Sequence, residues 1–371
     1  MRILFDYRPA LRRRTGVGEY VNETARALIA SAPPDERLSL FSASWKDRLA
    51  SDVVPGAETL DARVPVRALH LAWHRLEWPP VEWLAGKHDV VQSAHPLLIP
   101  SRHAAQLVTI YDLDFLDAPE RTRGEIRRDY PPLAPSHARR ADQVITISSH
   151  TADAIETRLG VPRSHISICR PGAPDWPRRA AEPKAHGSIL FLGTLEPRKN
   201  LGVLLDAYSA LIVARPDAPP LVLAGQIPAG AEDLVRRARE RPLAGHVELP
   251  GYVSDVDKAA LFRRALVFVL PSHTEGFGMP AIEAMSVGVP VIAAGRGALV
   301  ESVGDAGTLV SPDNPAELTQ ALTTILSDAS RRDRMREAGW LHVQQFTWAR
   351  TAAGVREAWH LARDHHAGRR G

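Results

Sequence analysis

Short, almost wholly apolar runs alternate along the chain with longer segments of helical period. In the first half these runs lie at residues 3–5, 38–41, 90–92, 107–110 and 144–147, and in the second half at 189–192, 221–223, 247–249, 267–270 and 289–293. Helical patterns separate them, notably at 18–30 and 149–159. Because strands that are apolar on both faces belong to parallel sheets covered by helices, the pattern predicts an α/β protein with one parallel sheet in each half.

The alternation stops between the halves, at residues 170–187. This segment is rich in alanine and charge and carries four prolines, at positions 171, 174, 177 and 183, so no regular structure is expected in it. A chain of 371 residues is also about twice the length of a typical domain. We therefore predict two Rossmann-like domains, at 1–177 and 178–345, followed by a C-terminal segment at 346–371.

The C-terminal segment has the period of a helix. Trp348, Val355, Trp359 and Ala362 recur at helical spacing within residues 347–363. The tail at 364–371 is short and polar, and we expect it to be disordered.

Charge and cysteine content narrow the class of protein. The net charge is only +3, from 46 basic and 43 acidic residues, and no nucleic-acid signature accompanies it, so no nucleic-acid partner is expected. A single cysteine, Cys169, excludes an internal disulfide and a cysteine-rich metal site, and predicts a core residue. No secretory signal and no run of about 18 apolar residues is present, which predicts a cytoplasmic protein.

One amphipathic segment leaves attachment to the inner face of a membrane open. At residues 66–77, apolar and basic side chains lie largely on different helical faces. The apolar set is Val66, Leu69, Trp73 and Leu76; the basic set is Arg67, His70, His74 and Arg75. Such a stripe is typical of the core face of a surface helix, or of a helix that rests on an anionic membrane, and the nearby Trp78 and Trp83 also suit a lipid acceptor.

Two glutamates eight residues apart carry the strongest chemical signal. Glu275 follows the apolar run at 266–270, and Glu283 comes one turn into a helix that Pro280 is suited to begin. Glycines at 276 and 278 add backbone freedom to the loop. Ligands bind at the carboxyl ends of parallel strands, and carboxylates beside a helix N-terminus suit a ligand with hydroxyls and phosphates. The alternative is a strand–turn–helix with ordinary surface glutamates.

A second signal lies between the strand at 189–192 and the helix at 201–213. Asn200 is a natural N-cap for this helix. Arg198 and Lys199 lie just before the N-terminus of this helix, where the helix dipole favours anions and disfavours cations. A diphosphate bound between the two cations would offset this unfavourable interaction and so explain their position. The alternative is a pair of solvated surface cations. We expect both cations to be accessible to solvent.

These segments resemble a known family. Residues 271–292 are similar to the E-x7-E signature of retaining, GT-B-type glycosyltransferases of family four, and residues 191–200, 251–255 and 307–326 resemble the same family. The resemblance implies two Rossmann-like domains that face each other across a cleft, with a C-terminal helix crossing back to the first. It also implies transfer of a hexose, with mannose as the first choice, from a nucleotide-diphosphate sugar to a saccharide or lipid-linked saccharide acceptor.

The resemblance further implies residue roles. Glu283 would bind ribose, Glu275 the donor sugar, and Arg198 with Lys199 the diphosphate as it leaves. Further residues would line the donor site: Gly16, Gly18, Tyr252, Val253, Thr274, Gly276, Phe277 and Gly278. Val253 lies in a turn that Ser254 and Asp257 follow in a capping-box pattern.

In the first half, the resemblance places His95 at the reaction centre and Asp112 on the sugar or a neighbouring cation. Relatives often carry histidine where this chain has Tyr111. Asp112 and Asp114 form a D-x-D triplet, the metal motif of another glycosyltransferase fold; the two-domain signals favour cations of the protein instead, so no metal and no other cofactor is expected. The arginines at 12–14 fit a solvated loop or an acceptor clamp.

Two other functions remain open at this point. A nucleotide-sugar 2-epimerase shares the GT-B fold without an external acceptor, and the runs at 197–200 and 275–278 argue against it. A non-catalytic sugar-nucleotide-binding protein is the second alternative, for which Tyr111 is the one indication.

Overall fold

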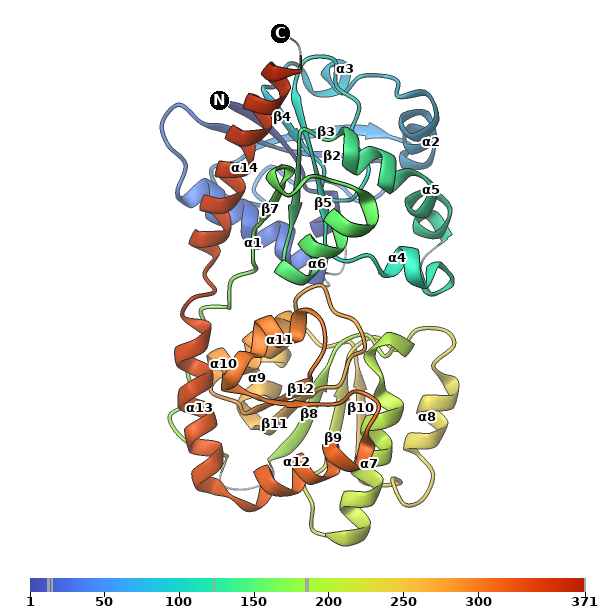
Figure 1. Cartoon of the computed structure of the whole chain (residues 1–371), viewed down its shortest axis with the longest axis vertical. Coiled ribbons are helices and arrows are strands. Elements are labelled where there is room, and N and C mark those ends of the chain that lie inside the picture. The colour runs from blue at the N-terminus through green and yellow to red at the C-terminus, as the bar shows by residue number, and fades with distance from the viewer. Residues whose placement is uncertain (12–13, 15, 123, 184–186, 370–371) are drawn as a thin grey trace. The chain divides into compact units, whose positions relative to one another are not determined.

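The computed structural model describes residues 1–11, 14, 16–122, 124–183 and 187–369, and forms two compact units (Figure 1). One unit comprises Met1–Gly172 together with Thr347–Gly371, and the other Ala173–Phe346. The units therefore divide at Gly172, five residues before the boundary expected from the prolines. The C-terminal helix belongs to the first unit, so the chain enters the second unit and returns.

The first unit contains a parallel sheet with the strand order β3-β2-β1-β4-β5-β6-β7. Its strands are β1 (Arg2–Asp6), β2 (Arg37–Ser44), β3 (Glu58–Val64), β4 (Val90–Gln92), β5 (Ala105–Ile110), β6 (Gln143–Thr146) and β7 (Ile166–Ile168). Its helices are α1 (Gly16–Ala30), α2 (Val66–Leu76), α3 (Glu82–Ala85), α4 (Asp114–Asp117), α5 (Gly124–Arg140), α6 (Ser149–Ala154) and α14 (Trp348–Gly368). The strands β4 and β6 are fully buried, and β1 is buried after its exposed first residue Arg2, as their apolar runs predict.

The strand β3 is absent from the sequence-based prediction. Its residues Glu58 to Val64 mix polar and apolar side chains, and most of them are only half-buried. Because β3 pairs with β2 alone and closes the sheet as an edge strand, its burial does not require the continuous apolar run that marks a central strand.

Helix α14 packs on the first unit. Trp359 is fully buried, and its indole nitrogen donates to Gln92 Oε1 at 2.7 Å. Arg356 pairs with Glu36 at 2.8 Å. The helix continues to Gly368, so the expectation of a disordered tail is wrong for residues 364–368, while residues 370–371 lie outside the described residues. Within this stretch His365 stacks on His165, with ring centroids 3.9 Å apart.

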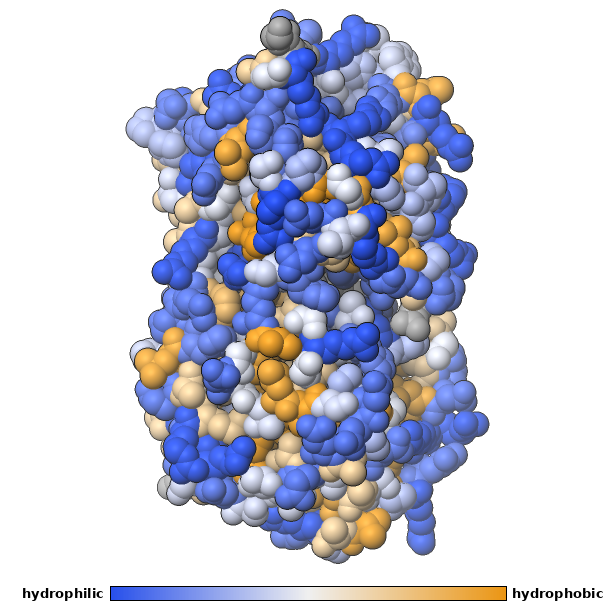
Figure 2. Space-filling view, in the orientation of Figure 1, coloured by the Kyte–Doolittle hydropathy of each residue, from blue (hydrophilic) through white to orange (hydrophobic). Residues whose placement is uncertain are grey.

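Helix α2 only partly follows its predicted amphipathic face. Leu69 and Trp73 are buried, but Leu76 is 72% exposed. His70 and His74 are half-buried instead of lying on the solvent side. Across the described residues, no helix has the length and apolar character needed to span a membrane. Figure 2 shows mostly hydrophilic residues on one face of the molecule, with hydrophobic residues in small groups.

The second unit contains a parallel sheet with the strand order β10-β9-β8-β11-β12-β13. Its strands are β8 (Ser188–Leu192), β9 (Leu221–Ala224), β10 (Val247–Gly251), β11 (Ala265–Leu270), β12 (Val291–Ala294) and β13 (Thr308–Val310). Its helices are α7 (Leu201–Ala214), α8 (Glu232–Ala238), α9 (Asp255–Arg264), α10 (Met279–Val287), α11 (Ala298–Val303), α12 (Pro315–Ser327) and α13 (Ala329–Val343). The α/β class with two parallel sheets is confirmed.

The proline-rich segment before β8 lacks helix and strand at residues 173–183, as expected, yet it is packed on the second unit. Trp176 lies against Phe262, with ring centroids 5.9 Å apart. Arg179 is buried, and its guanidinium donates to the carbonyl of Ala265. Residues 184–186 of the predicted linker lie outside the described residues.

Candidate active site

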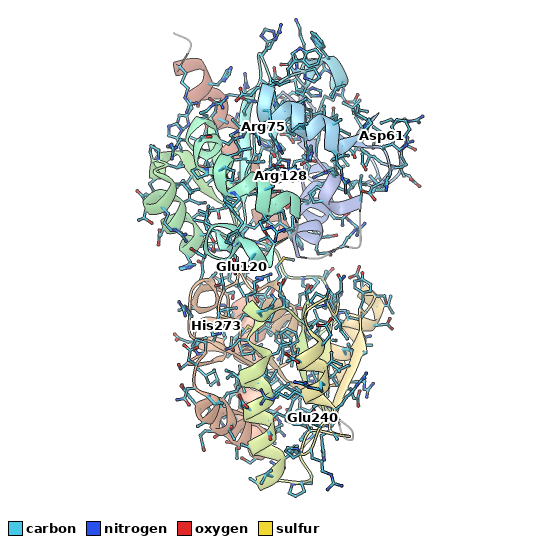
Figure 3. The ribbon with its side chains drawn as sticks, turned by 90° about the vertical axis from the view of Figure 1, so that its right-hand side faces the viewer. Asp61, Arg75, Glu120, Arg128, Glu240 and His273 are labelled. Carbon is cyan, nitrogen blue, oxygen red and sulfur yellow. The ribbon has the colours of Figure 1, made fainter. Side chains whose placement is uncertain are left out.

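The second sheet has a point where its strand order reverses. β8 and β11 are neighbours there, while β9 flanks β8 and β12 flanks β11. In open parallel sheets, ligands bind beyond the carboxyl ends of the strands at such a point. The two loops that follow β8 and β11 meet at this edge, because His273 (labelled in Figure 3) donates its backbone N–H to the carbonyl of Arg198 at 2.9 Å.

Glu275 is the centre of a charged cluster in these loops. Its Oε1 accepts from Lys199 Nζ at 2.6 Å and from Ser272 Oγ at 2.7 Å, and its Oε2 lies 3.6 Å from the guanidinium of Arg198. The side chains of Lys199 and Glu275 are each only 8% exposed. Burial alone would raise the pKa of Glu275, but Lys199 and Arg198 outweigh it and lower the pKa, so the carboxylate is charged at neutral pH.

The expectation that both cations are accessible is therefore wrong for Lys199, which is buried as the partner of Glu275. Arg198 stays nearer the surface, with a side chain that is 23% exposed. Its Nε donates to Glu196 Oε1 at 2.7 Å, and its Nη1 donates to the carbonyl of Thr274 at 3.2 Å. Arg198 thus holds the two loops together at their solvent side.

Asn200 precedes α7 but does not cap it with its side chain. Its backbone is left-handed, with φ of 55°, and its Nδ2 donates to the carbonyls of Pro271 and Pro312 at 3.2 and 2.6 Å. The predicted N-cap bond is therefore wrong. The amide instead connects the loop after β8 to two other loops of the same edge, which is a contact that only the fold creates.

Glu283 lies one turn into α10, as predicted. It is buried, and its Oε1 accepts from Lys258 Nζ at 3.0 Å, whereas its Oε2 is buried without a hydrogen-bond partner among the described residues. Lys258, on α9, also lies 5.1 Å from the centre of the Trp176 ring. An unpaired buried carboxylate oxygen has a strong tendency to accept a hydrogen bond, and a ligand hydroxyl would supply one.

Two residues of the glutamate loop shape the backbone. Gly278 has a φ of +90°, and a Cβ built on it would lie 2.4 Å from Leu299 Cδ2, so the position requires glycine. The Phe277 ring is buried against Phe346, with centroids 5.3 Å apart, and so the ring itself is unavailable to a ligand. Both residues fix the path of the chain between Glu275 and Glu283.

The remaining donor-site candidates border this loop or the end of β10. Thr274 and Val253 are half-buried, Gly276 is buried, and Tyr252 is 47% exposed just beyond β10. The predicted cap of α9 is confirmed: Ser254 Oγ accepts from the backbone N–H of Asp257 at 3.2 Å. Tyr252 thus stands between a strand end and a capped helix, with its ring accessible.

The strand order of the first sheet reverses between β1 and β4. Asp6 is the last residue of β1, and His95 lies in the loop that follows β4. His95 Nε2 lies 3.7 Å from Asp6 Oδ2, and its Nδ1 accepts from the backbone N–H of Leu97 at 3.3 Å. Burial lowers the pKa of His95 well below its usual value and raises the pKa of Asp6. His95 is therefore neutral, with its proton on the Nε2 that faces Asp6.

Several groups around His95 were not identified from the sequence. His70 and Tyr130 place their rings 6.1 and 6.2 Å from the His95 ring. Burial lowers the pKa of His70 to about 3, and His74 lies 3.2 Å from Asp129. Only one feature of the sequence could have indicated that His70 and His74 lie together. They are four residues apart in α2, which places them on one helical face.

In the region after β5, the expected contact of Asp112 with a sugar or a neighbouring cation stays a prediction. Asp112 Oδ1 accepts from the backbone N–H of Asp114 at 3.1 Å, which stabilises the turn into α4. The hydroxyl of Tyr111 is buried and has no hydrogen-bond partner among the described residues, and its ring meets Tyr20 edge-on at 5.6 Å. Within the described ranges, no three histidine, cysteine or carboxylate side chains converge on a metal position.

The glycine loop after β1 leads directly into α1. Gly16 is the exposed first residue of α1. Gly18 is buried, and a Cβ built on it would lie 2.8 Å from the Pro9 carbonyl oxygen, so this glycine permits close packing of α1. Arg12, Arg13 and Thr15 of the arginine-rich run lie outside the described residues, and Arg14 is exposed.

Comparison with known proteins places this geometry in a family. Residues 173–341 match the family model described as glycosyl transferases group 1. The chain is 30% identical to O-antigen chain mannosyltransferase B of Escherichia coli, over 94% of this chain and 96% of that protein. The chain belongs to the glycosyl transferases of group 1. It is also 29% identical to D-inositol 3-phosphate glycosyltransferase 2 of Catenulispora acidiphila, over 75% of this glycosyltransferase and 67% of that one.

Solved structures share the fold of this glycosyltransferase. Sucrose-phosphate synthase of Thermosynechococcus elongatus aligns with a TM-score of 0.77 at 20% identity, covering 96% of this chain and 97% of that one. HepE of Anabaena, solved with UDP and glucose, aligns with a TM-score of 0.71 at 19% identity, covering 96% and 98%. These likenesses confirm the GT-B class of fold expected from the sequence.

Proposed function

We propose that this glycosyltransferase moves a hexose from a nucleotide-diphosphate sugar to a saccharide or lipid-linked saccharide acceptor, with retention at the transferred carbon. Mannose is the first choice, supported by the mannosyltransferase relative that matches 94% of this chain. UDP- and dTDP-sugars are the alternatives for the donor. The bound UDP and glucose of HepE support a nucleotide and a sugar as ligands of the same kind of fold.

The observation that carries the proposal is the cluster of Arg198, Lys199 and Glu275 at the switch point between β8 and β11. It places two cations beside one carboxylate where an anionic ligand is expected. In our proposal, the diphosphate of the donor contacts the two cations while Glu275 accepts hydrogen bonds from the hydroxyls of the donor sugar. Glu275 also keeps Lys199 in place before the donor arrives.

Charge develops on the diphosphate as the bond from its oxygen to the sugar carbon breaks. Arg198 and Lys199 would stabilise that charge, and no metal ion is required in this proposal. The acceptor oxygen forms the new bond to the sugar carbon on the same face, and its proton passes to the departing phosphate oxygen. Front-side attack of this kind is supported by the resemblance to retaining enzymes.

Glu283 is proposed to hold the ribose of the nucleotide. Its Oε2 is buried and unpaired among the described residues, so a ribose hydroxyl would satisfy it. Tyr252, with its exposed ring beyond β10, is proposed to contact the base. In the first unit, neutral His95 is proposed to donate from Nε2 to a sugar hydroxyl, because Asp6 Oδ2 lies 3.7 Å from this nitrogen, beyond hydrogen-bond distance.

Thermal-shift measurements with GDP, UDP and dTDP test the donor proposal. A nucleotide present at 100 times its dissociation constant adds about 2.7 kcal/mol of stability, which is easily detected. Arg198→Ala should abolish this shift, while the matched control Arg215→Ala, at the far end of α7, should keep it. An unchanged shift in Arg198→Ala would contradict the diphosphate site.

Transfer itself is tested by incubation of GDP-mannose with and without a mannose-containing acceptor. Release of GDP that depends on the acceptor, with an α-linked product by NMR, supports retaining transfer. Conversion of the donor to an epimer without any acceptor would support the epimerase alternative, and nucleotide binding without turnover would support the non-catalytic one. Full activity after dialysis against EDTA is expected, because the proposed site relies on cations of the protein.

A further inference from the structure

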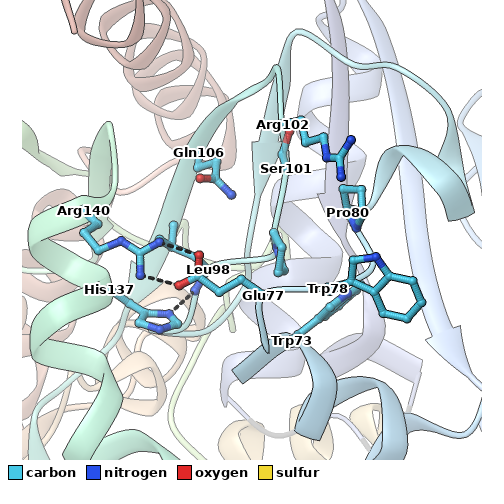
Figure 4. Close-up of a pocket in the computed structure, with 11 residues that line it drawn as sticks. Trp73, Glu77, Trp78, Pro80, Leu98, Ser101, Arg102, Gln106, His137 and Arg140 are labelled. Atoms are coloured by element: carbon cyan, nitrogen blue, oxygen red, sulfur yellow. Dashed lines mark hydrogen bonds and ion pairs between the residues drawn. The ribbon is translucent and has the colours of Figure 1, made fainter. Parts of the chain in front are cut away.

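The first unit carries a pocket that the proposed transfer chemistry does not use. It has a volume of about 150 Å³, well below the roughly 300–1,000 Å³ typical of sites for drug-sized ligands (Figure 4). Indole rings and planar polar groups line it: Trp73, Trp78, Glu77, Gln106, His137 and Arg140. This size suits a single small unit of a larger ligand.

The pocket lies near the beginnings of the strands, whereas His95 lies beyond their ends. Gln106 is the second residue of β5, and Arg140 is the last residue of α5, just before β6 begins. Glu77 directly follows the end of α2. In a parallel sheet, the strand beginnings and the strand ends lie at opposite edges, and His95 follows the end of β4. A ligand in this pocket therefore occupies a separate site.

One wall of the pocket is a fixed pair of charges. Arg140 donates to both carboxylate oxygens of Glu77, at 2.5 and 2.8 Å, across 63 residues of sequence (Figure 4). Glu77 adopts a left-handed backbone conformation, with φ of 49°, which residues with a side chain rarely take. Both side chains are about half-exposed, and the pair presents a planar edge of donors and acceptors with little net charge.

The pocket also offers a hydrogen-bond donor and an acceptor that have no partners among the described residues. His137 Nδ1 accepts from the backbone N–H of Leu98 at 2.9 Å, so in the neutral ring Nε2 carries the hydrogen. Gln106 is anchored by its Nε2, which donates to the carbonyl of Ile99 at 2.6 Å, and its Oε1 remains available. No described residue pairs with His137 Nε2 or Gln106 Oε1. These atoms suit hydroxyl groups, which both donate and accept.

Indole rings supply the apolar part of the site. Trp73 is buried, and its Nε1 donates to the carbonyl of Pro79 at 2.8 Å, which fixes the ring. Trp78 at the rim is 50% exposed and meets Trp83, itself 63% exposed, edge-on at 5.5 Å. An exposed indole is a flat apolar surface, and the C–H face of a sugar ring stacks well on such a surface.

We propose that this pocket is a second saccharide-binding site, which holds one sugar unit of the acceptor or product chain away from the transfer site. The proposal rests on the saccharide acceptor of the proposed function. Stacking on Trp78, together with hydroxyl contacts to His137, Gln106 and the Glu77–Arg140 pair, provides the recognition. Such a site keeps a growing saccharide attached between successive transfers.

A lipid surface is the competing occupant, and the structure favours the saccharide. Membrane binding uses unpaired cations around an apolar surface, whereas Arg140 is neutralised by Glu77. The unpaired polar atoms of His137 and Gln106 line a concave site, where lipid chains could not satisfy them. These polar groups match a polyhydroxylated ligand.

The test measures binding of α-linked mannotriose to the full-length protein by titration calorimetry and tryptophan fluorescence. Trp78→Ala should weaken binding about tenfold, the size expected for loss of one aromatic stacking contact. Gln106→Ala should also weaken it. Trp45→Ala is the matched control, because Trp45 is 65% exposed on the same unit but outside the pocket, and it should bind like the unchanged protein. Circular dichroism verifies that each variant is folded.

Two outcomes overturn the inference. The first is that the protein does not bind mannotriose, or that Trp78→Ala binds it equally well, while the melting temperature still responds to GDP. The proposed function then stands without this site. The other is loss of binding to vesicles of phosphatidylcholine and phosphatidylglycerol in Trp78→Ala with unchanged mannotriose binding, which assigns the pocket to lipid. Failure of every nucleotide in the thermal-shift series would instead refute the proposed function.

Discussion

Replacement of Lys199 by methionine probes the buried charge pair at the candidate active site. The change keeps the length of the side chain but removes the ammonium group that lies 2.6 Å from Glu275. The carboxylate would then remain in a site where its side chain is only 8% exposed. We expect a less stable protein whose remaining catalytic activity is far below that of the unchanged enzyme.

The contacts of Glu275 set limits on the folding stability that Lys199→Met loses. Removal of one partner from a buried ion pair costs about 3–5 kcal/mol, because the other charge stays buried and uncompensated. Arg198 at 3.6 Å and the Ser272 hydroxyl at 2.7 Å still face Glu275, so we expect about 3 kcal/mol, the lower end of that range. Glu275→Gln in the same protein removes the unpaired charge, so the double variant should recover part of the loss.

Urea unfolding of both single variants and the double variant, followed by circular dichroism, gives the coupling energy. The coupling should exceed about 1 kcal/mol, as is usual for residues in direct contact. Lys46→Met, at an exposed position, is the control and should leave the midpoint unchanged. If the two single losses add without coupling, or if Lys199→Met unfolds like the control, the charge pair does not stabilise this site and our interpretation of Glu275 is wrong.

Three further predictions concern the same site, the buried histidines and the glutamate loop. Glu283→Gln should mainly raise the donor KM, whereas Glu275→Gln should mainly lower kcat, because the ribose changes little along the reaction while the donor sugar gains positive charge. Steady-state kinetics separate the two effects, and equal binding-type losses would contradict the assignment. Burial lowers the pKa of His137 to about 4 and of His70 to about 3, so the unfolded chain takes up protons first as the pH falls below 6.5. The free energy of unfolding should therefore be greatest above pH 6.5 and fall toward pH 4, by up to about 1.4 kcal/mol per pH unit for each histidine. A urea midpoint that is equal at pH 7.5 and pH 5 would refute this. Gly278→Ala should lower the urea midpoint, because its Cβ would lie 2.4 Å from the Leu299 side chain in a left-handed backbone; a midpoint like that of the unchanged protein would show that the loop adapts.

The sequence by itself determined the α/β class, the two sheets and the loops that form the candidate active site. Central strands of a parallel sheet are buried on both faces, so they appear as continuous apolar runs that can be read locally. Arg198 and Glu275 each follow such a run. Because the carboxyl ends of parallel strands share one edge, their approach could be predicted, although the order of the strands could not.

The tertiary structure decided which charged side chains pair with one another and which of them are buried. Lys199 and Glu275 are 76 residues apart and form a buried pair, although the sequence led us to expect a Lys199 that is accessible to solvent. Lys258 reaches Glu283 from another helix, and Glu77 meets Arg140 across 63 residues. Helical and strand periods report which face of an element is apolar, but they do not report which charged group packs opposite. That choice depends on how separate elements fill the space around a site, and only the folded chain contains this information.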